Sequence, residues 1–442
     1  MSAAAASNSN QPLVHQWMPF TANRHFQEAP RLIARAEGVY YFNTQGQKLL
    51  DGSSGLYCIP LGHGRREIHE AVSRQMAELD YAPPFQYGVP AAFQLAHELS
   101  QMLPAGLNRV LFTGSGSEAV DSALKIAIQY HRVRGEGQRQ RFIGRERGYH
   151  GVNFGGWSVG GMVNNRKAFG IGLPAVSHMR HTAIPENKFV MGQGEHGADL
   201  ADDLQRFVDL HGADTIAACI VEPIAGSTGI LVPPKGYLKR LREICTKHGI
   251  LLIFDEVITG FGRTGQAFAA DTFGVVPDIM TLAKAISNGS IPMAAVAVRE
   301  DVQQTILDAA PPNSVELFHG YTYSAHPVAC AAALATLKIF RDEDIFGQVR
   351  ELTPGFLEQI GAFRDLPYVT DTRGFGLLGA VDLEPQGKPG ERGYKILCKA
   401  FEAGLVLRAA GDSIVLAPPF VATPQEIERM TEIMRDVIIA TA

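Results

Sequence analysis

Residues 250–257, ILLIFDEV, decide the fold class of this 442-residue chain. Five successive apolar residues precede two acids, and such a run is typical of a strand that is buried on both faces. The preceding segment, residues 236–249, has a helical period. A second apolar run, residues 277–284 (PDIMTLAK), follows after a loop. Alternation of buried strands with helices predicts a mainly parallel sheet.

The same alternation extends toward the N-terminus. The apolar run 108–114 (NRVLFTG) precedes a helical pattern over 117–133, and the run 215–223 (TIAACIVEP) precedes the helix over 236–249. Glycine and proline gather where these segments join, as they do in loops. We therefore expect a large α/β domain over residues 65–330, with a mainly parallel sheet flanked by helices.

The two ends of the chain have a different pattern. Residues 38–55 contain TQGQ between two apolar runs, which predicts a hairpin. After residue 340 the pattern predicts helices over 345–363 and 423–440 and strands within 374–383 and 413–420. We expect segments 13–64 and 331–442 to meet in a smaller α+β domain, and residues 1–12 to form a flexible polar arm.

The composition of the chain argues against several classes of protein. A formal net charge of −5 argues against a protein that grips nucleic acid. The five cysteines are widely spaced without a CxxC motif, which argues against a disulfide framework or a clustered metal site. No apolar run reaches the length of a membrane span, and the first residues do not resemble a secretory signal. We expect a cytoplasmic protein without membrane, nucleic-acid or metal partners.

The first chemical motif is LFTGSGSEAVDSALKIAI, residues 111–128. A strand leads into a Gly/Ser turn, and a helix begins near Ser117. Glycines allow close approach of the backbone, and a helix N-terminus offers unpaired N–H groups, so the pattern indicates an anion site of the phosphate-binding kind. The alternative is an ordinary helix that is capped by Ser117.

The second motif is the end of the strand that opened this section. Ligands bind at the carboxyl ends of strands in doubly wound sheets, and Asp255 lies at such an end. A carboxylate in a buried strand needs a cationic partner to remain ionised. The alternative is that Asp255 only caps the following loop or pairs with Arg263.

The third motif is Lys284 in the otherwise uncharged segment IMTLAKAISNG, residues 279–289. It follows Asp255 by 29 residues, enough for a loop, a short helix and the next strand, so the two side chains can lie at neighbouring strand ends. A partly desolvated lysine has a lowered pKa and becomes an amine nucleophile that can form a Schiff base. The alternative is a strand-end lysine whose charge reaches water.

A phosphate turn, a buried carboxylate and a nucleophilic amine together fit one cofactor. Pyridoxal 5′-phosphate (PLP) carries a phosphate, a ring nitrogen that must stay protonated, and an aldehyde that condenses with lysine. Each motif alone is ambiguous, and their order and spacing favour PLP.

The chain resembles class III, fold-type I aminotransferases, closest to the omega-amino acid:pyruvate (beta-alanine:pyruvate) group. The resemblance extends over about residues 13–440. The stretches that carry it are WMPFTANR, DYAPPFQYG, FTGSGSEA, GRERGYHGVN, VEPIAGSTGILVPPKGYLKRLREIC, FDEVITGFGRTG, DIMTLAK, NGSIPM, HGYTYSAHPVACAA and RAAGDSIVLAPPF.

The resemblance implies roles around the cofactor ring. Lys284 forms the Schiff base and then moves the proton between the substrate Cα and C4′ of the cofactor. Asp255 pairs with the pyridinium nitrogen. Val257 packs on one face of the ring, and Tyr149 stacks on the other.

The resemblance also implies a phosphate site that two subunits share. Gly116 and Ser117 hold the phosphate at the helix start, and Thr322, with Tyr321 beside it, reaches the phosphate of the neighbouring subunit. This implies a homodimer with shared active sites, with a homotetramer as the alternative assembly. For Thr322 alone, a hydroxyl that pairs across a sheet is the simpler interpretation.

A further set of residues is implied at the substrate pocket. Arg408 clamps a substrate carboxylate, for which its planar fork is suited. Tyr57, Phe20 and the neighbouring subunit's counterpart of Phe85 line the pocket, and Glu222 supports the site. Without the resemblance, Arg408 reads as a solvated surface residue, Tyr57 as core packing and Glu222 as a satisfied strand-end carboxylate.

Three positions depart from the family pattern. Tyr57 stands where many relatives have tryptophan, which should reshape the pocket. Ile258 stands where the ornithine and 4-aminobutyrate branches usually have glutamine, which argues against those branches. Ala294 stands where glycine is commoner.

The implied reaction is a ping-pong transamination. The amino group of an omega-amino acid or amine passes to pyruvate, giving L-alanine and an aldehyde or ketone. An aminomutase, racemase or decarboxylase would use the same Lys284 and Asp255, and so remains an alternative. A catalytically inactive binding relative and a nicotinamide dehydrogenase are further alternatives; the latter lacks a dinucleotide fingerprint.

Overall fold

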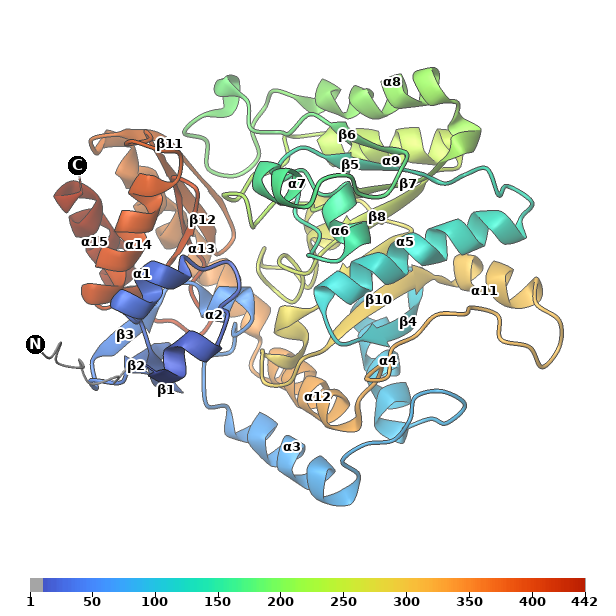
Figure 1. The fold of residues 1–442 in the computed structure, drawn as a ribbon, viewed down its shortest axis with the longest axis horizontal. Coiled ribbons are helices and arrows are strands. Elements are labelled where there is room, and N and C mark those ends of the chain that lie inside the picture. Colours follow the sequence, from blue (N-terminus) through green and yellow to red (C-terminus); the bar gives the residue numbers. More distant parts are fainter. Residues whose placement is uncertain (1–10, 442) are drawn as a thin grey trace, which may run out of the picture.

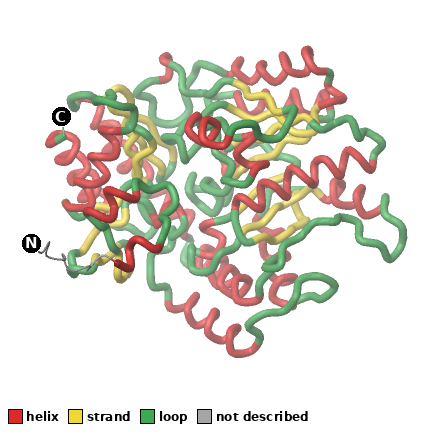
Figure 2. Tube along the Cα trace, viewed as in Figure 1, coloured by secondary structure: helices red, strands yellow, loops and turns green. Residues whose placement is uncertain are grey.

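The structure is a computed structural model that describes residues 11–441 (Figures 1 and 2). Its centre is a seven-stranded sheet with the order β4-β10-β9-β8-β7-β5-β6, and two four-stranded sheets accompany it. The strands of the central sheet are β4 (Leu107–Thr113), β5 (Arg141–Arg145), β6 (Val176–Met179), β7 (Ile216–Val221), β8 (Leu251–Asp255), β9 (Ile279–Leu282) and β10 (Ala294–Arg299). Strands β5 to β9 pair in parallel, whereas β10 runs antiparallel to both of its neighbours.

Helices cover both faces of this sheet, and β8 shows why its sequence is apolar throughout. Leu251 and Ile253 belong to the hydrophobic cluster that contains the buried face of α5, and Leu252 and Phe254 belong to the cluster that contains α9. A strand between two such layers buries every side chain. The helices of this part are α3 (Arg66–Glu78), α4 (Pro90–Met102), α5 (Gly116–Val133), α6 (Phe154–Val159), α7 (Val163–Phe169), α8 (Asp202–His211), α9 (Tyr237–His248), α10 (Ala269–Phe273), α11 (Glu300–Asp308) and α12 (Pro327–Asp342).

The first and last described segments of the chain lie side by side, at the left of Figure 1. In the sheet β1-β2-β3-β13, strand β3 pairs in parallel with β13, more than 350 residues later in the chain. The remaining strands are β1 (Ile33–Glu37), β2 (Tyr40–Asn43), β3 (Lys48–Asp51), β11 (Val369–Phe375), β12 (Leu378–Leu383), β13 (Leu405–Val406), β14 (Arg408–Ala410) and β15 (Ser413–Leu416). The remaining helices are α1 (Asn23–Glu28), α2 (Ser54–Tyr57), α13 (Ile345–Gly361), α14 (Glu391–Glu402) and α15 (Pro424–Ala440).

The α/β class predicted from the sequence is confirmed, and so are its main strands and the hairpin at TQGQ, where β2 and β3 pair antiparallel. One strand prediction is wrong in detail. The segment 374–383 is divided between the end of β11 and β12, because Gly376, at φ +57°, turns the chain between them. Residues 1–10, most of the predicted arm, lie outside the described residues, and Gln11–His15 forms a 3₁₀ turn.

Among residues 11–441, no helix combines the length and the apolar character needed to cross a membrane. Within the same range, no three or more His, Cys, Asp or Glu side chains are grouped so that they could hold a metal ion.

Candidate active site

Two neighbouring strand ends carry the predicted acid and amine. In the pairing of β8 with β9, Asp255 lies opposite Thr281, and Lys284 follows Thr281 by three residues at the start of a 3₁₀ turn. The parallel strands therefore bring Asp255 and Lys284 to one edge of the sheet, as the sequence predicts.

Lys284 has an unusual backbone and a sheltered side chain. Its φ of +53° lies in the left-handed region, which costs a residue with a Cβ about 1–2 kcal/mol. The ammonium nitrogen lies 5.3 Å from the centroid of the Tyr57 ring. Burial lowers the pKa of Lys284, and the nearby Arg408 acts in the same direction, while Asp255 opposes it. A lysine in these surroundings is better suited to nucleophilic chemistry than one whose charge reaches bulk water.

Asp255 is held by three donors. His150 Nδ1 lies 2.8 Å from its Oδ2, and the Val257 amide and the Thr281 hydroxyl each donate to its Oδ1 at 3.1 Å. Arg263 is not a partner; its Nη1 donates to the Pro418 carbonyl at 2.7 Å. A carboxylate can accept about four hydrogen bonds, so one position on Asp255 remains for a ligand.

His150 is a site residue that the sequence analysis missed, although it lies in the quoted motif GYHG. It is 1 % exposed, and its Nε2 has no hydrogen-bond partner in the described part of the chain. The sequence feature that could have identified His150 is its position directly after Tyr149. No local pattern links it to Asp255, since the two residues are 105 positions apart.

The Gly/Ser turn leads into α5 as predicted, but the cap is Ser115 and not Ser117. Ser115 Oγ accepts a hydrogen bond from the Glu118 amide, while Ser117 Oγ accepts one from the Val152 amide. The first two helical amides, those of Gly116 and Ser117, have no acceptor among the residues described. They are the N–H groups that a helix start offers to an anion.

Gly116 also keeps this turn open. A Cβ at this position would come within 3.2 Å of both methyl groups of Val257 and 3.5 Å of the Ala283 Cβ. The phosphate-type turn therefore adjoins the strand ends that carry Asp255 and Lys284.

Glu222 and Tyr149 are joined at the end of β7. Glu222 is 4 % exposed, and its carboxylate accepts hydrogen bonds from the amides of Tyr149, at 2.9 Å, and Gly226, at 3.2 Å. Burial is the main cause that raises the pKa of Glu222 to about 7; the nearby Asp255 acts in the same direction, and His150 opposes both. Glu222 thus holds the backbone of Tyr149, and its charge depends on pH near neutrality.

Tyr57 and Arg408 meet at the loop that follows β7. The Tyr57 hydroxyl donates to the Gly226 carbonyl at 3.4 Å, and Arg408 Nη2 donates to the Ser227 carbonyl at 3.2 Å. Arg408 Nε is buried, without an acceptor in the described range. The guanidinium therefore retains unused donors that could bind a carboxylate.

Two more arginines fix this loop. Arg147 Nη2 donates to the Thr228 carbonyl at 3.0 Å, and Arg373 Nε donates to the Gly229 carbonyl at 2.7 Å. The Ser227 carbonyl, which accepts from Arg408, is consequently followed by two residues whose carbonyls are also fixed by arginine side chains.

The structure does not bring every predicted residue to this cluster. Tyr321 packs on α5, where its hydroxyl donates to the Glu118 carbonyl at 3.3 Å. Thr322 is exposed. Phe20 and Phe85 are 78 % and 53 % exposed in the single chain. No described contact joins Thr322, Phe20 or Phe85 to Lys284.

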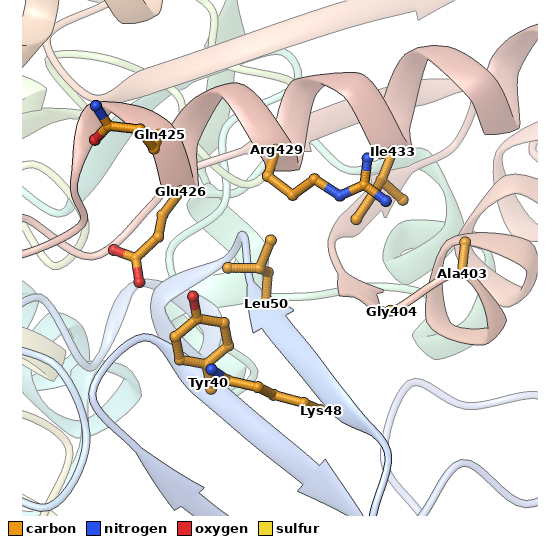
Figure 3. Close-up of a pocket in the computed structure, with 9 residues that line it drawn as sticks. All are labelled: Tyr40, Lys48, Leu50, Ala403, Gly404, Gln425, Glu426, Arg429 and Ile433. Atoms are coloured by element: carbon orange, nitrogen blue, oxygen red, sulfur yellow. The ribbon is translucent and has the colours of Figure 1, made fainter.

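A cavity of about 460 Å³ lies elsewhere, between the β2–β3 hairpin and α15 (Figure 3). Lys48 lies over the ring of Tyr40 there, with its Nζ 3.5 Å from the ring centroid. None of the predicted site residues lines this cavity. Its lining residues are Tyr40, Lys48, Leu50, Ala403, Gly404, Gln425, Glu426, Arg429 and Ile433.

Known proteins resemble the whole chain. The sequence model of the family Aminotransferase class-III matches residues 21–438. An omega-aminotransferase of Caulobacter vibrioides is 51% identical over 424 residues, which cover 96% of each chain. An omega-amino acid–pyruvate aminotransferase of Pseudomonas putida is 46% identical, over 99% of this chain and 98% of the relative.

Solved structures agree with the sequence relatives. The crystal structure of the omega transaminase from Pseudomonas jessenii in complex with PMP superimposes with a TM-score of 0.92, at 34% identity, over 99% of this chain and 98% of the other. Together with the site geometry, these matches show that the chain belongs to the class III aminotransferase family.

Proposed function

We propose that this protein is a PLP-dependent omega-aminotransferase. It moves the amino group of an omega-amino acid or amine to pyruvate, and gives L-alanine and an aldehyde or ketone. One observation carries the proposal. A sheltered lysine amine and a carboxylate with one open acceptor position lie at adjacent strand ends, beside a helix start whose first two amides have no acceptor within residues 11–441.

The residues at this edge fit PLP. The amides of Gly116 and Ser117 would bind its phosphate, and the open position of Asp255 would accept a hydrogen bond from its protonated ring nitrogen. Val257 and Tyr149 would cover the two ring faces. When bound, PLP supplies an electron sink for the carbon that bears the amino group.

Each side chain then has a definite task. Lys284, with its pKa lowered by burial, removes and returns the proton at the amine-bearing carbon. Asp255 keeps the ring nitrogen protonated, and His150 orients Asp255 through the 2.8 Å contact. Burial of these groups excludes water, which strengthens their electrostatic interactions.

Arg408 would bind the carboxylate of pyruvate in a bidentate pair. An omega-amino acid carries its carboxylate far from its amine, so Arg408 must serve two different geometries or be bypassed. Its contact with the Ser227 carbonyl gives the guanidinium a partner when no carboxylate is bound.

We further propose a homodimer with shared active sites, in which Thr322 reaches the neighbouring subunit's phosphate, and a homotetramer is the alternative assembly. The exposure of Thr322, Phe20 and Phe85 in the single chain supports this proposal. A cytoplasmic location remains a prediction from composition.

An amine panel tests the function. Purified protein with PLP is incubated with pyruvate and β-alanine, longer omega-amino acids, 4-aminobutyrate or 1-phenylethylamine, and alanine is measured. Alanine formation that requires both partners supports the proposal. Turnover of an amino acid without any keto acid would favour an aminomutase, racemase or decarboxylase instead.

Borohydride trapping tests the cofactor bond separately. After reduction, peptide mapping should find the pyridoxyl group on Lys284, and the Lys284→Ala variant should yield no adduct at that position. An adduct on another lysine would contradict the assignment.

A further inference from the structure

His319, which the sequence analysis did not assign to the site, is tied to helix α5 by both ring nitrogens. Its Nε2 lies 2.7 Å from Ser122 Oγ, and its Nδ1 lies 3.4 Å from Lys125 Nζ. Because an ammonium group can only donate, Nδ1 accepts and Nε2 carries the proton. His319 Nε2 therefore donates to Ser122.

The chain of hydrogen bonds continues into the first turn of α5. Ser122 Oγ donates to the Glu118 carbonyl at 2.7 Å, and the Tyr321 hydroxyl donates to the same carbonyl at 3.3 Å. The rings of His319 and Tyr321 also meet edge to face, with centroids 5.1 Å apart. Two side chains of the loop 319–324 are thus fixed on one helical turn.

Glu118 connects this loop to the phosphate-type turn. Its carboxylate accepts a hydrogen bond from the Gly114 amide at 2.6 Å, and its own amide donates to Ser115 Oγ at 3.2 Å. The turn that would hold this chain's own phosphate and the loop that carries Thr322 therefore share one residue as their anchor.

Thr322 itself is left free to reach another molecule. Its carbonyl accepts from the Tyr81 hydroxyl at 3.0 Å, so the backbone is held while the residue stays exposed. The Phe85 ring lies close against Gly320 of the same loop, because a Cβ on Gly320 would come within 2.9 Å of it.

We propose that His319 is a positioning residue for the cofactor phosphate site of the neighbouring subunit. By clamping the loop 319–324 to α5, it fixes Thr322 in the orientation that the other subunit requires. Helix α5 thereby serves two sites, its own through the amides of Gly116 and Ser117 and the neighbour's through Thr322. This inference rests on the proposed PLP-dependent dimer.

Cofactor affinity is the first test. The dissociation constant for PLP is measured by absorbance titration of cofactor-free protein, for the wild type and for His319→Leu. We expect affinity to fall about tenfold, equivalent to about 1.4 kcal/mol, and saturating PLP to restore most of the turnover. His319→Gln keeps an N–H donor and should restore most of the affinity; His211→Leu, on α8, is the control.

Ser122→Ala removes the same link without adding bulk, and thus guards against misfolding of the leucine variant. It should weaken PLP binding in the same direction, with a thermal unfolding midpoint close to that of the wild type. Unchanged PLP affinity in both folded variants would overturn the proposal.

Hybrid dimers decide which site His319 serves. One protomer carries Lys284→Ala, so that a single site per dimer keeps its lysine, and His319→Leu is placed either on that protomer or on its partner. The intact site belongs to the protomer that keeps Lys284. PLP retention at this site should weaken only when His319→Leu is on the other protomer, the one that carries Lys284→Ala. Weakening from the same protomer would show that His319 acts within its own chain, and monomeric protein would overturn the proposal.

PLP binding is read directly in these experiments, so the result does not depend on turnover. Wild-type protein that binds PLP but forms no alanine would refute the proposed transamination and leave the role of His319 intact.

Discussion

Asp255 and Glu256, two adjacent carboxylates at the end of β8, have different roles. Asp255 faces His150 and the candidate cofactor site. Glu256 points elsewhere and accepts hydrogen bonds from the amides of Ala269 and Ala270, at 2.7 and 2.8 Å, at the start of α10. Successive strand residues point to opposite faces, so the alternation assigns one acid to chemistry and the other to structure.

Arg408 gives a prediction at the scale of one side chain. Arg408→Ala should raise the KM for pyruvate about 10- to 100-fold, since charged hydrogen bonds contribute about 1.5–3 kcal/mol. The KM for 1-phenylethylamine, which has no carboxylate, should change far less. Steady-state kinetics with each substrate varied in turn measures both values, with the surface variant Arg429→Ala as control. An unchanged KM for pyruvate would contradict the assignment.

Glu222 gives a prediction about pH. Its pKa is raised from 4.5 to about 7 in the folded chain by burial. Between these values the folded protein binds more protons than the unfolded one, so the wild type loses stability as pH rises through this window. Glu222→Gln cannot ionise, and it loses only the acceptor for one amide.

The variant should therefore be clearly less stable than the wild type at pH 5, and the difference should shrink by pH 8. Urea unfolding of the cofactor-free proteins at both pH values measures it. A difference that stays constant or grows with pH would show that Glu222 is already ionised in the folded protein at pH 5.

At the scale of elements, the short segment α2 stores strain beside the site. Ser54, Gly55, Leu56 and Tyr57 all have positive φ, between +47° and +68°, so the chain turns left-handed there. The turn is held by Asp51, whose carboxylate accepts from the Gly55 amide at 2.8 Å. It directs Tyr57 into the core beside Lys284.

Leu56→Gly should relieve part of this strain. Leu56 is 48 % exposed, so few contacts are lost. Release of about 1–2 kcal/mol of left-handed strain exceeds the entropic cost of glycine, about 0.5–1 kcal/mol. Chemical unfolding should show a gain of up to about 1 kcal/mol, whereas Leu210→Gly, on helix α8, should lose about that amount. Loss of stability in Leu56→Gly would mean that the leucine makes contacts beyond the single chain.

The same turn marks the limit of sequence reasoning for elements. Strands such as β8 and helices such as α5 were predictable, because apolar periodicity is a local property of the sequence. Ser54, Leu56 and Tyr57 each carry a Cβ in this left-handed turn, which opposes local preference. The turn is held by contacts such as the hydrogen bond from the Gly55 amide to Asp51 and the burial of Tyr57. The division of residues 374–383 between two strands likewise depended on one glycine turn.

The oligomeric state of the complete protein is a prediction that solution measurements can test. The protein should elute with twice the 47.9 kDa mass of one chain, or four times that mass if dimers pair. Light scattering after gel filtration measures this mass. Elution as a monomer that retains full activity would contradict shared active sites.

Three features could be predicted from the order of amino acids: the α/β class, the strand ends that carry Asp255 and Lys284, and the glycine turn at the start of α5. Each follows from a short stretch whose pattern dictates local structure. Neighbouring strands then bring these stretches to one edge of the sheet. Three contacts became visible only in the folded chain: His150 pairs with Asp255, Arg408 donates to the Ser227 carbonyl, and β3 pairs with β13. The physical reason is that these contacts join residues about 100 to 350 positions apart, and a hydrogen bond between distant residues leaves no periodic trace in the sequence.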